Sequence, residues 1–329
     1  MHGDNFGDIR GRFRDMSREG MLMQHSQGTF QGANGTELFY QAWHPAAQAR
    51  AIIVGVHGHG DHSGGLRSII RYLLSIGYCW YGFDLRGHGR SQGKRGHLTT
   101  WSDFREDLKS FQRLVMERES NRPIFLVGHS LGGLICLDYA MHYPESLEGI
   151  ITISPLLDYS AISPFVKLFL RGVAFVRPEF SIEGQTGHQK LTRDPDALKA
   201  LDADELRHEI LSAGLWRETD ACRRWVCAHP QNLRVPLLML YGLADRITPA
   251  RAMREFFQSV SFVVKERREY EEARHRPFDD LNRGEVLDHL AAWLNARLGA
   301  SECLTLEKRI YRRDRNGQAV SEKVTANRA

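Results

Sequence analysis

The chain has 329 residues, 42% of them hydrophobic and 26% charged, which is typical of a globular protein with one large core. It has no run of about 18 apolar residues, so the sequence predicts no transmembrane helix. The net charge of +4 arises at the C-terminal end, because residues 304–329 hold seven basic and three acidic side chains. A basic excess confined to one tail argues against a nucleic-acid-binding face. It predicts a solvated tail, with transient contact with an anionic membrane surface as the alternative.

The N-terminal residues and the cysteines indicate the compartment. Residues 1–20 are polar and charged, without the apolar segment of a secretory signal, and we expect them to form a flexible arm. The cysteines are scattered and odd in number, which argues against a disulfide framework: Cys79, Cys136, Cys222, Cys227 and Cys303. The expected location is therefore cytoplasmic, with membrane-peripheral attachment as the alternative.

The segment 21–155 predicts the first part of an α/β core. It opens with a hairpin of residues 27–31 and 37–43, joined at Asn34-Gly35, a pair that accepts the positive φ of a tight turn. Short apolar runs typical of buried strands then alternate with helical patterns. Over the whole chain, the predicted strands are 51–56, 78–85, 124–127, 149–153, 237–241 and 262–265, and the predicted helices are 66–76, 101–117, 134–141 and 281–298. This alternation predicts a mostly parallel sheet with helices on both faces.

The segment 156–235 interrupts the alternation, because it holds only helix-like pieces. They span 165–176, 195–201, 204–214 and 219–228. An insertion after the carboxyl end of a strand lies over the edge of such a sheet where ligands bind. We therefore predict a helical cap, with ordinary core helices as the alternative. The core resumes over 236–298, and 299–329 is expected to be a basic, flexible tail.

The run Gly128-His129-Ser130-Leu131-Gly132 follows the apolar strand 124–127 and precedes a helix. A strand, a sharp turn and a helix in this order present the central serine as a nucleophile. The alternative is a glycine-rich structural turn. We predict Ser130 as the nucleophile.

A serine needs a base, and the base needs an acidic group that orients it. Among 15 histidines, His275 lies in a polar loop between the last strand and the last helix, and His289 is the reserve. Asp245 follows the strand 237–241 and precedes His275, in the order that the mechanism expects. An Asx turn is the competing interpretation of Asp245, and Asp158 is the alternative acid.

Backbone N–H groups of His59 and Leu131 are the predicted donors to the oxyanion, one after an early strand and one after the nucleophile. His57, His59 and His62 have a spacing that would also permit a zinc site, but no second set of ligands supports one. No metal is therefore expected.

Taken together, these motifs resemble those of the α/β-hydrolase family, in its branch of monoacylglycerol lipases and lysophospholipases. The matching pieces are 57–64, 84–91, 128–133, 242–245, the loop that carries His275, and the cap residues 191–195. The resemblance covers roughly residues 28–298 and implies serine esterase chemistry without a cofactor. Two positions depart from the family pattern: His59 stands where a small residue is usual, and Arg276 stands where a glutamate often follows the base.

The predicted function is hydrolysis of a small-molecule acyl ester, a monoacylglycerol or a lysophospholipid, through an acyl-enzyme on Ser130. The apolar set in 165–176 is too wide for one helical stripe, so Phe165, Phe169 and Leu170 are predicted to contact the acyl chain. Basic residues near the motifs leave a substrate with a phosphate head group as an alternative: Arg86, Arg90, Lys94 and Arg95. The oligomeric state is left open.

Two other functions remain as alternatives. One is a serine aminopeptidase, whose substrate's amino group would need acidic side chains in the cap; those available are Glu179, Glu183, Asp202, Asp204, Glu205 and Glu209. The other is a binding protein on a hydrolase scaffold, which should lack one of the three reactive groups.

Overall fold

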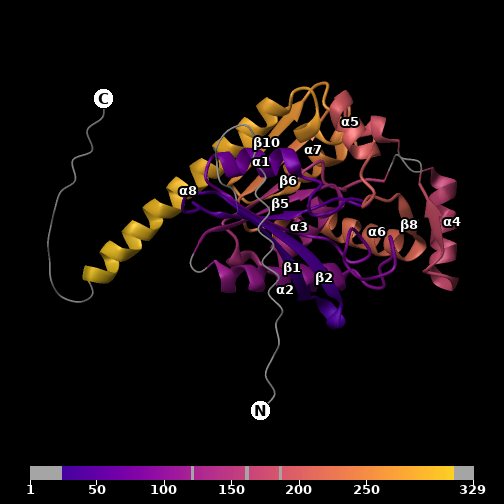
Figure 1. Cartoon of the computed structure of the whole chain (residues 1–329), viewed down its shortest axis with the longest axis horizontal. Coiled ribbons are helices and arrows are strands. Elements are labelled where there is room, and N and C mark those ends of the chain that lie inside the picture. The colour runs from indigo at the N-terminus through magenta and orange to yellow at the C-terminus, as the bar shows by residue number, and fades with distance from the viewer. Residues whose placement is uncertain (1–23, 120–121, 160–162, 185–186, 315–329) are drawn as a thin grey trace, which may run out of the picture.

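The computed structural model describes residues 24–119, 122–159, 163–184 and 187–314, with the backbone alone from 300 to 314 (Figure 1). The arm predicted for residues 1–20 lies outside the described residues, as do the last residues of the predicted tail.

One sheet of eight strands forms the centre of the protein. The strands run in the order β1 (Gln24–Gln31), β2 (Glu37–His44), β4 (Cys79–Phe83), β3 (Ile52–Val56), β5 (Ile124–His129), β6 (Gly149–Ile153), β9 (Leu237–Gly242) and β10 (Lys265–Tyr270). β1 and β2 pair antiparallel with each other, β2 pairs antiparallel with β4, and the remaining pairs are parallel. The parallel strands therefore direct their carboxyl ends to one edge, where ligands of such sheets bind.

The predicted hairpin is confirmed. Phe30 lies opposite Leu38 in the register of β1 and β2. The connection holds Asn34 at φ 58° and Gly35 at φ 70°. Asparagine and glycine tolerate this left-handed backbone better than other residues do.

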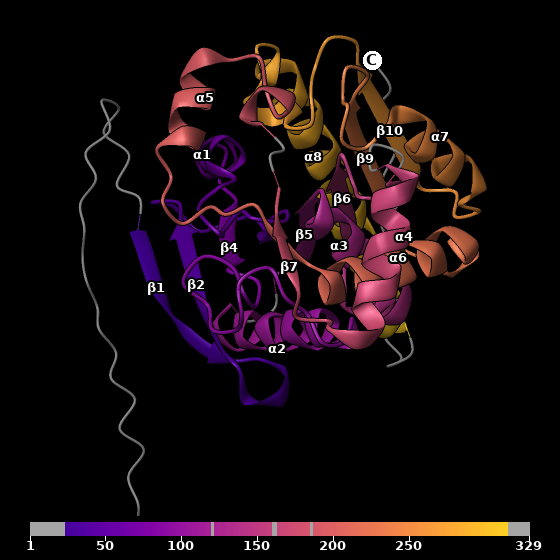
Figure 2. The ribbon, with the colours of Figure 1, turned by 90° about the vertical axis from the view of Figure 1, so that its right-hand side faces the viewer.

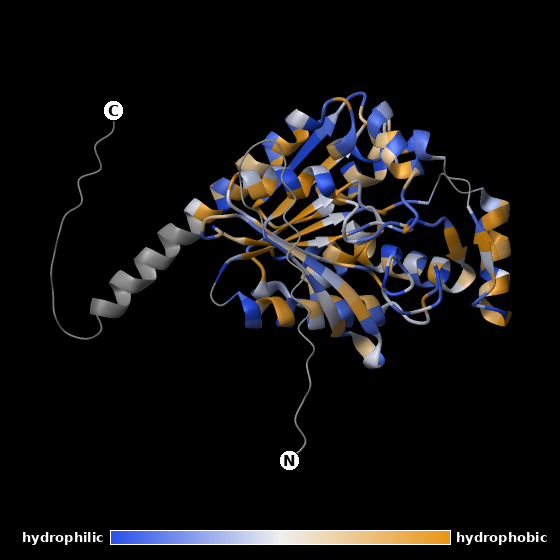
Figure 3. Cartoon of the chain, in the orientation of Figure 1, coloured by the Kyte–Doolittle hydropathy of each residue, from blue (hydrophilic) through white to orange (hydrophobic). Residues whose placement is uncertain are grey.

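Helices cover both faces of the sheet. α1 (Arg67–Ser75) and α8 (Arg283–Asp314) pack on one face, and α2 (Ser102–Arg118), α3 (Leu131–His142) and α7 (Ala250–Ser259) pack on the other. Side chains of β3 alternate between these layers, with Val54 in one cluster and Ile53 in the other. Because both faces are buried, the central strands are almost continuously apolar, as Figure 3 shows.

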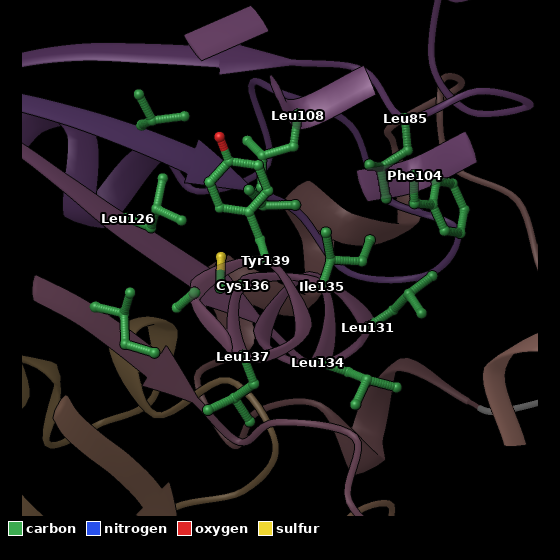
Figure 4. Close-up of a cluster of buried hydrophobic side chains, with 14 of the residues drawn as sticks. Leu85, Phe104, Leu108, Leu126, Leu131, Leu134, Ile135, Cys136, Leu137 and Tyr139 are labelled. Atoms are coloured by element: carbon green, nitrogen blue, oxygen red, sulfur yellow. The ribbon is translucent and has the colours of Figure 1, made fainter. Parts of the chain in front are cut away.

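Helix α3 is buried on every side from Leu131 to Met141 (Figure 4). Its first turn lies against the sheet so closely that a Cβ atom on Gly132 would be 2.1 Å from the carbonyl oxygen of Val56. Only glycine fits there, and the close approach brings the start of α3 to the ends of β3 and β5.

The predicted insertion lies between β6 and β9 and is not wholly helical. Its elements are α4 (Pro164–Val176), β7 (Ser181–Glu183), α5 (Pro195–Asp202), β8 (Ile210–Ser212) and α6 (Ala213–Ala228). β8 lies within the range 204–214, where the sequence pattern predicts a helix, and it pairs antiparallel with β7. The helix begins only after Ser212, whose hydroxyl caps it by accepting a hydrogen bond from the N–H of Leu215 (3.0 Å). Figure 2 looks onto the side on which α4, α5, α6 and β7 lie in front of the sheet.

Three other elements differ from the prediction. The last strand is Lys265–Tyr270 rather than 262–265. An edge strand needs few apolar residues, and the charged residues of this one do not give the apolar pattern that predicts a strand. Helix α7 was not predicted. Helix α8 continues to Asp314, beyond residue 298, where the core is predicted to end.

Candidate active site

Ser130 lies between β5 and α3 and is buried. Its backbone has φ 53° and ψ −116°, a strained conformation for a residue with a side chain. The Ser130 N–H donates to the carbonyl of Ile153 in β6 (3.0 Å), which holds the turn at the edge of the sheet. This strand, turn and helix have the geometry of a nucleophile elbow.

Asp245 and His275 lie together after the last two strands. The His275 imidazole donates from Nδ1 to Asp245 Oδ2 over 2.8 Å, and both side chains are buried. Thr248 also donates to Oδ2, from its hydroxyl (2.7 Å), while the N–H groups of Ile247 and Thr248 donate to Oδ1 (2.7 and 3.0 Å). With Nδ1–H directed at the carboxylate, Nε2 is the nitrogen left to accept a proton.

The surroundings of Asp245 keep it ionised. Burial alone would raise the pKa of Asp245, but the charge of His275 and the hydrogen bonds from His275 and Thr248 outweigh it and lower the pKa below the ordinary value. An ionised carboxylate at this position orients the imidazole and stabilises its protonated form.

The two alternatives to these residues have other partners. Asp158 accepts a hydrogen bond at Oδ1 from the N–H of Tyr159 (2.7 Å). His289 lies on α8, with Nδ1 3.1 Å from the hydroxyl of Tyr270. The geometry therefore favours Asp245 and His275 over Asp158 and His289.

His129, which the sequence did not single out for a role, contacts the loop of His275. Its Nε2–H donates to the carbonyl oxygen of His275 (3.1 Å), and the two ring centroids are 4.8 Å apart. Burial, reinforced by the charges of His275 and Arg276, holds the pKa of His129 well below its ordinary value. A neutral His129 thus fixes the backbone of the His275 loop. In the sequence, the position of His129 directly before Ser130 is the feature that points to this role.

The loop after β3 lies against Ser130. A Cβ atom on Gly58 would be 3.2 Å from the Cβ atom of Ser130. His57 shapes this loop, because its Nδ1–H donates to the carbonyl of Gly58 (2.8 Å) and its Nε2 accepts from the N–H of Leu85 (2.9 Å). His59 is the next residue in this loop, and Leu131 is the first of α3, where backbone N–H groups have no acceptor within the helix.

Two other histidines of this loop, His59 and His62, have ring nitrogens within hydrogen-bond distance of the cap. His59 Nε2 lies 2.9 Å from the carbonyl oxygen of Ile210, and His62 Nε2 lies 2.8 Å from Asp204 Oδ2, both in the cap. In the part of the chain that the structure describes, no group of three or more His, Cys, Asp or Glu side chains is placed to hold a metal ion.

The three predicted acyl-chain residues differ in environment. Leu170 is fully buried and packs with Ala174 against Ala213 and Trp216 of α6, so it anchors α4 within the cap. Phe165 and Phe169 are 83% and 53% exposed. Figure 3 shows α4 as a largely hydrophobic helix at the edge of the molecule.

The parallel sheet, the serine at a strained elbow and the Asp–His pair at the same edge define an α/β-hydrolase. The chain belongs to the family described as serine aminopeptidase, S33, which matches residues 47–282. Among the described helices, none combines the length and apolar character needed to cross a bilayer.

Curated relatives cover most of the chain. It is 27% identical to a monoacylglycerol lipase of Mycolicibacterium smegmatis over 275 residues, 83% of this chain and 98% of that protein. It is 28% identical to the monoglyceride lipase of Homo sapiens over 274 residues, 80% of this chain and 89% of that protein.

Solved structures share the fold. The monoacylglycerol lipase of Paleococcus ferrophilus matches with a TM-score of 0.70 and 29% identity, over 83% of this chain and 99% of that one. A soluble variant of monoglyceride lipase from Saccharomyces cerevisiae, in complex with a substrate analog, matches with a TM-score of 0.74 over 83% of this chain and 94% of that one. At 21% identity this second likeness shows the fold alone.

Proposed function

We propose that this protein hydrolyses the carboxylic ester of single-chain lipids, with Ser130 as the nucleophile. The observation that carries the proposal is the position of Ser130 on a strained turn at the sheet edge where Asp245 and His275 are hydrogen-bonded. An ester carbonyl is the electrophile that such a serine attacks.

The reaction runs in two halves. Nε2 of His275 takes the hydroxyl proton of Ser130, whose oxygen attacks the carbonyl carbon. The negative charge on the carbonyl oxygen is stabilised by the N–H groups of His59 and Leu131. His275 then gives the proton to the leaving alcohol, and a water deprotonated by His275 releases the acyl group and restores Ser130.

A lipid is the substrate class best supported. The relatives named above are monoacylglycerol or monoglyceride lipases, and α4 exposes apolar side chains that suit an acyl chain. Each methylene buried on binding contributes about 0.8 kcal/mol. Phe165 and Phe169 are the proposed contacts, while Leu170 acts through the packing of α4 on α6.

An uncharged head group is favoured over a phosphate. Arg86 is held by ion pairs with Asp103 (3.1 Å) and Asp107 (2.7 Å), and Lys94 pairs with Glu179 (2.8 Å). Two of the four basic side chains near the motifs are thus neutralised by ion pairs, which favours a monoacylglycerol over a lysophospholipid.

The aminopeptidase alternative follows from the family's description but has weaker support in the cap. Three of the six acidic side chains that could hold an amino group are already paired: Glu179 with Lys94, Asp202 with His188 and Asp204 with His62.

Transient contact with a membrane surface is part of the proposal. Large apolar side chains of α4 are exposed, and the same helix carries the cations Lys167 and Arg171 and no acidic residue, with Arg171 also 3.7 Å from Asp220 of α6. An apolar face with neighbouring cations suits an interface with anionic lipid, from which a single-chain lipid would be taken up.

The test combines active-site labelling with a substrate panel. A fluorophosphonate should label wild-type protein and not Ser130→Ala. A monoacylglycerol, a lysophosphatidylcholine and an aminoacyl anilide are then compared by kcat/KM. Faster turnover of the anilide than of every ester would replace the lipase proposal with the peptidase, and absence of labelling and of turnover would favour a binding protein.

A further inference from the structure

Asp61, in the loop after β3, is a buried carboxylate on which three segments of the chain meet. Arg276, the residue after His275, donates from Nη1 to Asp61 Oδ2 over 2.6 Å. Arg207 of the cap places its Nη1 2.6 Å from Asp61 Oδ1. The side chains of Asp61 and Arg276 are each 2% exposed, so this pair is shielded from solvent.

The Arg276 guanidinium also donates hydrogen bonds to two residues other than Asp61. Nη2 donates to the carbonyl of Gly65 (2.5 Å), and Nε and Nη2 both donate to Asp279 Oδ2 (2.9 and 2.7 Å). The backbone N–H of Arg276 donates to the carbonyl of Leu191 (2.8 Å). One planar group with donors in a fixed fork therefore joins the loop 57–65 to the loop 275–279.

Of the two cations on Asp61, Arg276 makes the firmer contact. Arg207 lies within ion-pair distance, but among the described residues its Nε and Nη1 donate no hydrogen bond of good geometry. The Asp61 carboxylate fits because residue 65 is a glycine: a Cβ atom there would be 2.0 Å from Asp61 Oδ1.

The two loops that Arg276 joins carry two different parts of the proposed machinery. One contains His275, and the other contains His59, whose N–H is the proposed donor to the oxyanion. We propose that Arg276 is a positioning residue, which acts through Asp61 to fix the separation between His275 and the His59 N–H. This rests on the proposed function of Ser130. A displacement of about 1 Å in such an arrangement can cost about a hundredfold in rate.

The experiment measures kcat per serine titrated by the fluorophosphonate, together with KM and the labelling rate. Arg276→Gln and Asp61→Asn should each lower kcat and the labelling rate by about ten- to a hundredfold, with KM changed by less than about twofold. Arg276→Lys, which keeps the charge without the fork, should give an intermediate loss. The double variant should be no slower than the slower single variant, because the two residues act as one unit.

Arg283→Gln is the matched control. It removes a different ion pair, between Arg283 of the core and Asp194 of the cap, and should leave kcat per titrated serine unchanged. Titration counts only folded sites. If Arg276→Gln does not fold, the values of kcat for Arg276→Lys and Asp61→Asn test the positioning role instead. Additive losses, an equal loss in Arg283→Gln, or rates within about twofold of wild type would overturn the positioning role. An unlabelled wild type would instead overturn the proposed function, and this inference with it.

Discussion

Ser130 has a left-handed backbone that its side chain disfavours, and the protein keeps it by packing glycines around the turn. Gly132 approaches the carbonyl of Val56, and Gly58 approaches Ser130 itself. Strain of this kind is retained where it presents a reactive group. At the scale of single residues, the proposed chemistry therefore rests on Ser130 and on the hydrogen bond between Asp245 and His275.

Ser130→Ala should fold normally and lose activity by about a thousandfold or more, because the substitution removes the attacking oxygen and little volume. Ester hydrolysis at saturating substrate measures the loss, with circular dichroism as the check on the fold. A rate within about tenfold of wild type would show that another group attacks.

Asp245→Asn should preserve the fold and lower kcat by about 10² to 10⁴, because an amide neither orients the imidazole correctly nor stabilises its protonated form. Asp158→Asn is the matched control, since Asp158 bonds to the N–H of Tyr159. A severe loss in Asp158→Asn beside a mild one in Asp245→Asn would reverse the assignment of the acid.

At the scale of elements, α4 differs from the rest of the cap. It packs on α6 through Leu170 and Ala174, while several of its large apolar side chains remain exposed. The segment around α5 is instead bonded to the body, where Arg193 pairs with Asp280 (3.0 Å) and Thr192 donates to the carbonyl of Asp279 (3.0 Å). Substrate selection is thus expected to depend on α4 and the cap's attachment on the later segments.

Lengthening the acyl chain from about four to about ten carbons should raise kcat/KM several-fold in wild type, since more methylenes are buried. Phe169→Asp should abolish this preference and spare short esters, because a carboxylate there opposes contact with a hydrocarbon chain. Val263→Asp is the control, as Val263 is an exposed apolar residue outside the cap. The same loss in both variants would show that α4 has no specific part in selection.

At the scale of the whole molecule, Asp61 links the core, the cap and the last loop, and it should make stability depend on pH. Burial would raise the pKa of Asp61, but Arg207 and Arg276 outweigh it and lower the pKa well below the ordinary value of 3.8. A carboxyl whose pKa is lower in the folded state stabilises the fold above its unfolded pKa. That contribution is lost as the pH falls through the folded value.

Asp61→Asn should therefore be less stable than wild type near neutral pH, by about 3 kcal/mol, because Arg207 loses its ion pair and Arg276 keeps only the one with Asp279. The difference should narrow as the pH falls below 3.8, because Asp61 of the unfolded chain then binds a proton while folded Asp61 stays charged until its own, lower pKa is reached. Urea unfolding at a series of pH values measures it. A difference that stays constant down to the acid limit would contradict the role of this ion pair.

From the sequence alone, the strands of the parallel sheet, the sharp turn at Ser130 and the proposed order of serine, acid and base could be predicted. These features have local signals: apolar runs of strand length, a glycine-flanked serine between strand and helix, and polar loops at strand ends. The edge strand β10 lies a few residues after its predicted position because most of its residues are charged, which removes the apolar period of a buried strand. Helix α7 was not predicted, although its apolar residues recur with helical spacing.

Only the tertiary structure decided which residues support the site. Arg276 meets Asp61 across 215 positions of sequence, and His129 meets the carbonyl of His275 across 146. It also decided that Leu170 packs inside the cap while Phe165 is exposed, although both belong to one apolar run. No spacing within a helix or strand encodes such contacts, because they arise where separate loops meet at the sheet edge and where one helix packs on another.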